Sequence, residues 1–279
     1  MPIVTVTSDW KDSSYYLPVL KGRLLSLFSQ GKAGNFTPAD LHIETVSTSV
    51  TPFNIPEGCF VLRHSFSSFP KGTIHLIAVE CEPAEGVEMV AVQYAGHWFV
   101  TPNDGRMSLV ASQGAMESGE AVGYAIPLPD KFSTFMACDL FAAAVSAICK
   151  GTFASELQVC PLKSVAGGMP AVMEDRIIGK VVYVDSYGNA ITNISRETFA
   201  RGYMMWRSRN EDDPEFEIYV GGPHLVLDMI HNCYTDVECG MDVAFFNWAG
   251  LLELAINRGN FSRVEGVETN VEIMIKFYR

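Results

Sequence analysis

The fold is indicated first by residues 3–28, which read IVTVTSDWKDSSYYLPVLKGRLLSLF. Residues 3–7 form a β-branched run that is typical of a short strand, and Ser8 and Asp9 close it. Apolar side chains then recur at positions 17, 20, 24, 27 and 28, and Pro18 fits the first turn of a helix with that spacing. The stretch therefore predicts a strand, a turn and a helix.

Strands and helices continue to alternate after this first unit. We predict strands over 42–46 and 72–79, a hairpin of strands 91–94 and 97–100, and helices over 55–66 and 139–150. Gly151 follows the last helix and is a typical stop signal. This alternation argues for a layered α/β structure.

The composition changes near residues 164–176, where glycine, proline and small side chains gather. The segments beyond it are short and β-rich, with turn signals between them, and lie at 177–184, 217–220, 243–247, 252–257 and 271–277. The acidic stretch 209–215 is interpreted as a solvated loop. We therefore predict an α/β N-terminal domain over 1–165 and a smaller all-β, barrel-like C-terminal domain over 166–279.

Composition excludes several classes of protein. Of the 279 residues, 48% are hydrophobic and 19% charged, so the chain can bury a core and is not expected to be disordered. The formal net charge is −12, which is the wrong sign for a general nucleic-acid binder or for an anionic membrane surface. We expect neither nucleic acid nor membrane as a partner.

Targeting signals and cysteine usage point to a cytoplasmic protein. The first residues carry no basic segment and no long apolar run, so no signal peptide is expected, and no stretch approaches the roughly 18 apolar residues of a membrane span. The seven cysteines are odd in number and lack a Cys-x-x-Cys pair, which favours free thiols over disulfides or zinc. The six histidines lack metal-ligand spacing, and no metal site is expected; His64 and His75 lie among apolar residues and are expected in the core or at its edge.

Two polar positions follow predicted strands directly. Asp9 would lie at the carboxyl end of a strand, where a carboxylate suits a ribose diol, although position alone favours a cap for the next turn. Residues 102–105, with Asn103 and Asp104, are by themselves a tight turn.

Residues 184–194 form a denser motif. Asp185 can hold an ammonium, Tyr187 can stack on a base, and Asn189 can read an amide-like edge. A hairpin turn built on residues 187–189 explains the same residues equally well.

Four glutamates, Glu80, Glu82, Glu85 and Glu88, cluster after the strand at 72–79. Paired carboxylates can act as acid and base or hold a metal, but an exposed acidic loop is the better interpretation from the residues alone.

Taken together, the motifs resemble one family, the S-adenosyl-L-methionine (SAM) hydroxide adenosyltransferases or SAM hydrolases, which are relatives of the fluorinase and chlorinase. The resemblance runs from Thr5 to about Phe277. The segments that carry it are Thr7–Asp9, Lys21–Gly22, Thr51–Ile55, Phe69–His75, Pro102–Gly105, Asp185–Ile194, Tyr234–Val237 and Gly250–Gly259.

The resemblance implies an α/β domain followed by a β-barrel, in a homotrimer that holds SAM between the N-terminal domain of one subunit and the C-terminal domain of its neighbour. It implies attack of an activated water or hydroxide on the ribose C5′ of SAM, which releases methionine and adenosine. SAM would be a substrate or ligand, with no cofactor.

The resemblance also assigns roles to ligand-binding residues. Asp9 would hold the ribose hydroxyls, Phe53 would form a wall beside the ribose, and Asp185 would meet the methionine ammonium. Tyr187 and Tyr234 would stack on adenine, and Asn189 would bind the edge of the base. Arg258 would lie where backbone groups contact adenine. Asn103, in the motif 102–105, is the last candidate for substrate binding.

The chain departs from the hydrolase pattern at its catalytic positions. The Asp-Pro-Gly-Val-Gly motif of the hydrolases reads Glu82-Pro-Ala-Glu-Gly86 here, and the Arg and His positions correspond to about Met89 and to Met136. Methionine neither donates a charged hydrogen bond nor accepts a proton, so Glu82 and Glu85 are the candidate catalytic groups.

Two further departures concern the halide and the methionine carboxylate. The Thr and Ser that hold halide in the halogenases correspond to Glu85 and Ala137, and a carboxylate would repel halide. The Ser that holds the methionine carboxylate corresponds to Trp248.

Three functions are therefore ranked. The first is a SAM hydrolase with a rebuilt site and slow turnover. The second is a non-catalytic binder of adenosine or SAM, and the third is an enzyme acting on another adenosyl substrate that Trp248 fits better.

Overall fold

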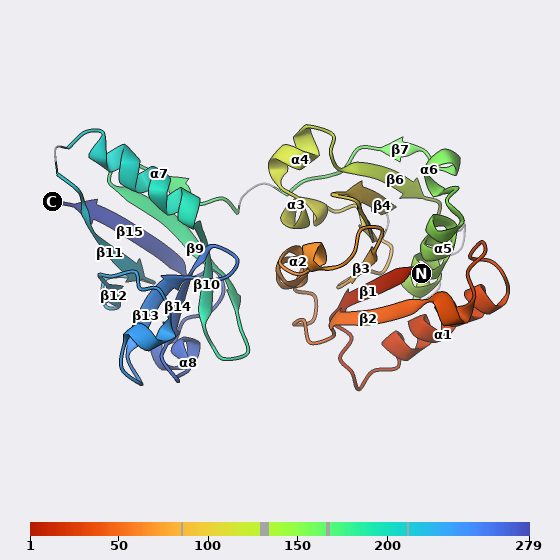
Figure 1. The fold of residues 1–279 in the computed structure, drawn as a ribbon, viewed down its shortest axis with the longest axis horizontal. Helices are drawn as coiled ribbons and strands as arrows, with labels where there is room; N and C mark the ends of the chain where they lie inside the picture. Colours follow the sequence, from red (N-terminus) through yellow and green to blue (C-terminus); the bar gives the residue numbers. More distant parts are fainter. Residues whose placement is uncertain (85, 129–133, 166–167, 211) are drawn as a thin grey trace. The chain divides into compact units, whose positions relative to one another are not determined.

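The computed structural model describes residues 1–84, 86–128, 134–165, 168–210 and 212–279. The chain divides into two compact units, Met1–Ala166 and Gly167–Arg279 (Figure 1). None of the helices in these ranges has the length and apolar character needed to cross a membrane.

The first unit is built on a mixed seven-stranded sheet with the order β2-β1-β3-β5-β4-β6-β7. Strands β2, β1, β3 and β5 are parallel, whereas β4 runs antiparallel to both β5 and β6. The strands are β1 Ile3–Ser8, β2 His42–Ser47, β3 Ile74–Ala78, β4 Met89–Tyr94, β5 His97–Pro102, β6 Val122–Ile126 and β7 Val159–Cys160. The carboxyl ends of the parallel strands thus share one edge of the sheet.

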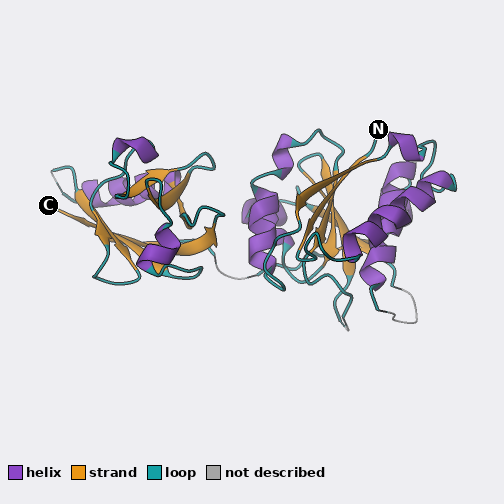
Figure 2. Ribbon diagram, turned by 90° about the horizontal axis from the view of Figure 1, so that it is seen from below, coloured by secondary structure: helices purple, strands orange, loops and turns teal. Residues whose placement is uncertain are grey.

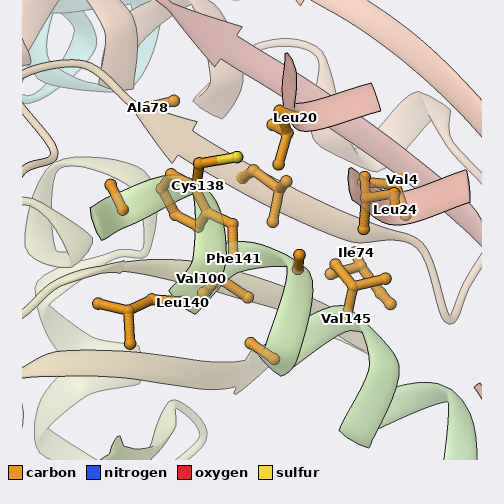
Figure 3. Packing of buried hydrophobic residues seen from close by; sticks show 14 of the residues in the cluster. Val4, Leu20, Leu24, Ile74, Ala78, Val100, Cys138, Leu140, Phe141 and Val145 are labelled. Atoms are coloured by element: carbon orange, nitrogen blue, oxygen red, sulfur yellow. The ribbon is translucent and has the colours of Figure 1, made fainter. Parts of the chain in front are cut away.

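Helices cover both faces of this sheet (Figure 2). Helices α1 (Tyr16–Ser29) and α5 (Met136–Lys150) pack on one face, and α2 (Ile55–Arg63) and α3 (Met107–Val110) pack on the other. Figure 3 shows the α1 and α5 side, where Leu20, Leu24, Phe141 and Val145 meet Val4 and Ile74 of the strands. Short helices complete the unit: α4 Gln113–Glu117, α6 Phe153–Glu156, and the 3₁₀ turns Pro38–Asp40 and Phe66–Ser68.

The predicted α/β architecture of the N-terminal part is confirmed, with two differences at helix ends. Helix α2 stops at Arg63 instead of residue 66. Just after its end, the Ser65 hydroxyl donates to the Val61 carbonyl at 2.8 Å and so competes with backbone N–H groups for that acceptor. Helix α5 begins three residues before the predicted start, after Phe135 in a left-handed conformation, and ends at Gly151 as predicted.

The second unit is an antiparallel sheet with the order β12-β11-β15-β9-β10-β14-β13, and β8 pairs with β9. Its strands are β8 Ala171–Val172, β9 Arg176–Val184, β10 Ala190–Ser195, β11 Glu215–Val220, β12 Val226–Leu227, β13 Asp242–Phe246, β14 Leu251–Ile256 and β15 Glu272–Tyr278. The sheet nearly closes, because the His231 N–H, just after β12, donates to the Ala244 carbonyl of β13 at 2.7 Å. The barrel-like prediction is confirmed.

Helix α7 (Arg196–Arg207) was not predicted. Ser195 ends β10 and also caps this helix, since its hydroxyl accepts from the Thr198 N–H at 3.1 Å. Trp206 is buried in the barrel core, and the backbone at Gly202 approaches Ile177 closely. Helix α8 (Phe261–Glu265) and the 3₁₀ turn Tyr234–Asp236 complete the unit.

Candidate functional site

Asp9 lies at the carboxyl end of β1, between the ends of its neighbours β2 and β3. Its Oδ2 accepts hydrogen bonds from the Phe53 N–H at 2.9 Å and from the Glu80 N–H at 3.4 Å. The carboxylate therefore joins two loops that are distant in sequence, one after β2 and one after β3, instead of capping the turn that follows it.

Both residues that donate to Asp9 have unusual backbone conformations. Phe53 has a φ of 65° and Glu80 a φ of 41°, which are uncommon for residues with side chains. Such conformations cost of order 1–3 kcal/mol each and persist only where the surroundings hold them. Phe53, whose N–H contacts this carboxylate, is 72% exposed as a residue.

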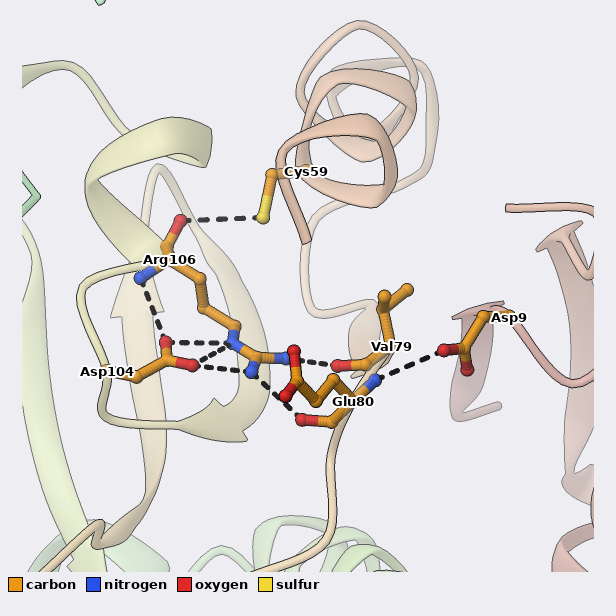
Figure 4. Close-up of polar contacts among 6 residues, drawn as sticks. All are labelled: Asp9, Cys59, Val79, Glu80, Asp104 and Arg106. Carbon is orange, nitrogen blue, oxygen red and sulfur yellow. Dashed lines mark hydrogen bonds and ion pairs between the residues drawn. The ribbon is translucent and has the colours of Figure 1, made fainter. Parts of the chain in front are cut away.

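Arg106 supports the Glu80 side of this arrangement and was missed by sequence reasoning. Only 2% of the residue is exposed, and its guanidinium donates to the carbonyls of Val79 at 2.5 Å and Glu80 at 3.1 Å (Figure 4). The Asp104 carboxylate also accepts from the guanidinium, and Arg106 Nε lies 2.9 Å from Asp104 Oδ1. The sequence marks residues 102–105 as a motif but gives no sign of Arg106 directly after it, because Arg106 binds backbone carbonyls.

Glu82 is placed at the amino end of α5. The backbone N–H groups of Ala137 and Met136 lie near enough to its carboxylate to affect its pKa. Partial burial raises the pKa of Glu82, and these two N–H groups offset this in part by favouring the charged form. Glu85, the other predicted catalytic residue, lies outside the described residues.

Aromatic rings gather close to Glu82. Phe135 packs against Trp10 and Tyr16, with ring centroids 5.4 Å and 4.8 Å apart. The pKa of Tyr16 is raised, chiefly by its hydrogen bond with Tyr15 and further by the charge of Glu82. The first unit thus presents two carboxylates and an aromatic cluster around strand ends and a helix end.

Asn103 is engaged in structural contacts. Its Nδ2 donates to the Pro161 carbonyl at 3.0 Å and to Glu88 Oε2 at 3.4 Å, and its Oδ1 accepts from the Lys163 N–H at 3.0 Å. These bonds tie residues 161–163 to the end of β5. Its contact with a ligand stays a prediction.

In the second unit, Asp185 closes the turn between β9 and β10. Its Oδ1 accepts from the N–H groups of Tyr187 and Asn189, each at 2.9 Å, and its Oδ2 accepts from Asn189 Nδ2 at 3.0 Å. The hairpin interpretation of this motif is therefore correct. The turn also holds Tyr187 outward, with 75% of that residue exposed.

A chain of side-chain hydrogen bonds leads from this turn into the barrel. Asn189 Nδ2 donates to the Tyr234 hydroxyl at 3.1 Å, which donates to Glu253 Oε1 at 2.5 Å. Glu253 is buried, and its Oε2 accepts from Asn247 Nδ2 at 2.9 Å. Burial and the bond to Glu253 raise the pKa of Tyr234, so its hydroxyl stays protonated. Sequence reasoning missed Glu253 and Asn247.

The loop after β14 packs against the same turn. The Ser262 N–H donates to the Gly188 carbonyl at 2.8 Å, and a side chain at Gly188, whose φ is 85°, would collide with Asn260. Arg258 precedes this contact and has a φ of 58°. The structure thus brings Asp185, Tyr187, Asn189 and Tyr234 together, with the Arg258 loop beside them.

Trp248 lies in the turn between β13 and β14 and is 83% exposed. Its neighbour Asn247 links that turn to Glu253. Within the ranges described, no group of three or more His, Cys, Asp or Glu residues could hold a metal ion.

Comparison with known sequences places this geometry in a family. The chain matches the SAM hydroxide adenosyltransferase N-terminal domain over residues 4–158 and the C-terminal domain of the same family over residues 179–274. The chain belongs to the SAM hydroxide adenosyltransferase family.

Two curated proteins similar to this adenosyltransferase family member are both named (R)-S-adenosyl-L-methionine hydrolase. The protein from Methanocaldococcus jannaschii is 26% identical over 99% of this chain and 96% of its own length. The protein from Thermus thermophilus is 24% identical over 81% of this chain and 85% of its own length.

Solved structures share the fold of this SAM hydroxide adenosyltransferase family chain. An uncharacterized conserved protein from Thermotoga maritima has a TM-score of 0.74 at 24% identity, covering 98% of this chain and 99% of its own. A conserved hypothetical protein from Thermus thermophilus has a TM-score of 0.70 at 20% identity, with complete coverage of both chains.

Met136 and Met89, which the resemblance sets against the His and Arg of the hydrolases, are both buried, and that correspondence stays a prediction. Met136 begins α5 and packs in the core of the first unit, and Met89 lies fully buried in β4. Neither side chain can take part in acid–base chemistry. The carboxylate of Glu82 lies near the backbone of Met136.

Proposed function

We propose that this protein binds S-adenosyl-L-methionine and hydrolyses it slowly to adenosine and methionine. The observation that carries the proposal is the position of Asp9: a carboxylate at the carboxyl end of β1, fixed through one oxygen by two loop N–H groups. The match along both units to one family and the names of two curated relatives support the same activity.

Asp9 would bind the ribose. Among the described residues, the two hydrogen bonds to Asp9 both use Oδ2, and Oδ1 would accept from a ribose hydroxyl. The exposed Phe53 ring beside it would form an apolar wall along the sugar.

The turn of residues 185–189 would bind the adenine and the amino-acid part. The bond from Tyr234 to Glu253 leaves the Tyr234 oxygen to accept from Asn189 Nδ2, whose amide also donates to Asp185. Asn189 Oδ1 is then left as an acceptor, and it suits a donor such as the exocyclic amino group of adenine. Tyr187 and Tyr234 would contribute rings for stacking, Asp185 a charge for the ammonium, and Arg258 the backbone contacts of its loop.

The reaction would be a displacement at C5′. A water oxygen forms a bond to C5′ while the C5′–S bond breaks and its electron pair stays on the sulfur of methionine, which neutralises the sulfonium. The water proton passes to a base, and we assign that role to Glu82, with Glu85 as the second candidate. Loss of an orienting acid–base group costs a factor of roughly 10²–10⁴, so turnover is expected to be slow.

We also propose that the active form is a homotrimer in which each site is completed by a neighbouring subunit. The resemblance to the family supports this assembly. Light scattering is expected to show about three chains per particle. A monomer that binds adenosine tightly would contradict it.

Calorimetric titration with adenosine and with SAM tests the proposal. Binding of both is expected, and Asp9→Ala is expected to weaken it measurably. No heat and no thermal shift at millimolar concentrations of either ligand would refute the proposed function.

A non-catalytic adenosyl-binding protein is the second candidate, and the burial of Met136 favours it. An enzyme for another adenosyl substrate is favoured by Trp248, which is exposed and which the resemblance sets against a small polar residue of the family. Binding of SAM without release of adenosine would distinguish both alternatives from a hydrolase. Formation of product from a different adenosyl compound would identify an enzyme for that substrate.

A further inference from the structure

We infer that Arg106 is a positioning residue for Asp9, acting through the peptide group between Val79 and Glu80. The inference rests on the proposed function only where ligand binding is used to test it.

The peptide between residues 79 and 80 is held at both ends. Its carbonyl belongs to Val79 and accepts from Arg106 Nη1 at 2.5 Å, while its N–H belongs to Glu80 and donates to Asp9 Oδ2 at 3.4 Å (Figure 4). A trans peptide is planar, with carbonyl and N–H pointing in opposite directions. Fixing the carbonyl on one side therefore fixes the direction of the N–H on the other.

Arg106 also holds the next peptide. Its Nη2 donates to the Glu80 carbonyl at 3.1 Å, so the guanidinium holds the carbonyls on both sides of the Glu80 Cα. Glu80 has a φ of 41°, a conformation that an unrestrained loop would leave. A hydrogen bond to a charged donor also polarises the peptide and strengthens its N–H as a donor.

The guanidinium itself is fixed by its surroundings. Asp104 Oδ1 accepts from Nε at 2.9 Å, and Asp104 Oδ2 accepts from Nη2 at 2.5 Å. The backbone carbonyl of Arg106 accepts from the Cys59 thiol of α2 at 3.6 Å, and burial raises the pKa of that thiol to about 12. Arg106 therefore connects α2, the turn after β5 and the loop after β3.

A salt bridge that served stability alone would need only Asp104. Replacing a buried ion pair by apolar side chains of similar volume is often neutral or stabilising. Arg106 also donates hydrogen bonds to the carbonyls of Val79 and Glu80, and an apolar replacement would remove these two bonds. That difference makes the inference testable.

The test uses the paired variant Asp104→Leu with Arg106→Met in the full chain, which leaves no unpaired buried charge. Amide exchange is measured without ligand. We expect the Glu80 N–H to exchange at least tenfold faster, by order of magnitude, while amides of β4 keep their protection. Unchanged exchange at Glu80 would overturn the inference, whether or not the protein binds an adenosyl compound.

Adenosine affinity provides the second readout, in a double-mutant cycle with Asp9→Ala. We expect the paired variant to raise the Kd about tenfold or more in the wild-type background and to add little when Asp9 is already absent. If the factors by which the paired variant and Asp9→Ala raise the Kd simply multiply, Arg106 does not act through Asp9. If the wild-type chain binds neither adenosine nor SAM, the proposed function fails, and the exchange experiment still decides the role of Arg106.

Discussion

Asn189 and Tyr234 are joined by a hydrogen bond of 3.1 Å from the side-chain amide to the phenol oxygen. Because Tyr234 in turn donates to Glu253, the direction of the bond is fixed, and so is the side of the Asn189 amide that faces outward. A buried glutamate thus determines how the Asn189 side-chain amide is oriented in the turn.

Tyr234→Phe is expected to weaken both the fold and adenosine binding. It removes a donor from buried Glu253 and an acceptor from Asn189, at a cost of about 1–3 kcal/mol in the free energy of unfolding. Urea unfolding and adenosine titration measure the two effects. Tyr219→Phe is the matched control, because the Tyr219 hydroxyl donates to Glu217 elsewhere in the same unit. If both variants bind adenosine like the wild type, the assigned role of Tyr234 is wrong.

Asp9→Asn is expected to raise the Kd for adenosine about tenfold, since a charged acceptor becomes a neutral one. Asp12→Asn serves as the control: Asp12 accepts from the Thr48 hydroxyl at 2.6 Å in a neighbouring loop. Equal affinities of Asp9→Asn and Asp12→Asn by calorimetry would remove Asp9 from the site.

Glu82→Gln is expected to lower the rate of adenosine release by a factor of about 10² or more. Burial raises the pKa of Glu82, so in the wild type the rate should increase with pH as the carboxyl ionises and then reach a plateau. That rise should be absent in Glu82→Gln and unchanged in Glu120→Gln, an exposed control in the same unit. A pH profile that Glu82→Gln leaves intact, with Glu85→Gln removing it, would transfer the role to Glu85.

The stability of the first unit is expected to fall in acid because of a buried histidine pair. His75 Nδ1 shares a hydrogen bond of 2.7 Å with the Thr5 hydroxyl, and its Nε2 lies 3.3 Å from His97 Nδ1. Burial lowers the pKa of His75 to about 3, with a further contribution from His97, whose own pKa is also lowered by burial.

The sign follows from these depressed pKa values. Below the ordinary histidine pKa of about 6.5 the unfolded chain binds protons that the folded chain does not, so stability falls as pH decreases toward 3. The slope is about 1.4 kcal/mol per pH unit for each such histidine. His75→Asn should reduce this slope in urea unfolding between pH 4 and 7, whereas His224→Gln, at an exposed position, should not. The same slope in both variants would show that His75 does not carry the effect.

Much of the fold could be predicted because the pattern of apolar residues matches burial. The spacing of residues 17, 20, 24 and 28 became the buried face of α1. Helix α7 was missed because Ser195 serves both as the last residue of β10 and as the helix cap, so no turn separates strand from helix.

The candidate site was only partly predictable. The positions of Asp9 and Asp185 followed from strand ends and from resemblance, but their partners did not. Arg106 binds carbonyls of residues 79 and 80, and carbonyls leave no trace in side-chain patterns. The contacts of Asn103 reach residues 161 and 163, and no local rule connects positions so far apart.

The most direct test of the account is incubation of the full chain with SAM, followed by chromatography of adenosine and methionine against a protein-free control. The account predicts slow release of the two products in equal amounts, reduced by Asp9→Asn and by Glu82→Gln. Absence of adenosine above the control at saturating SAM would contradict the proposed hydrolysis.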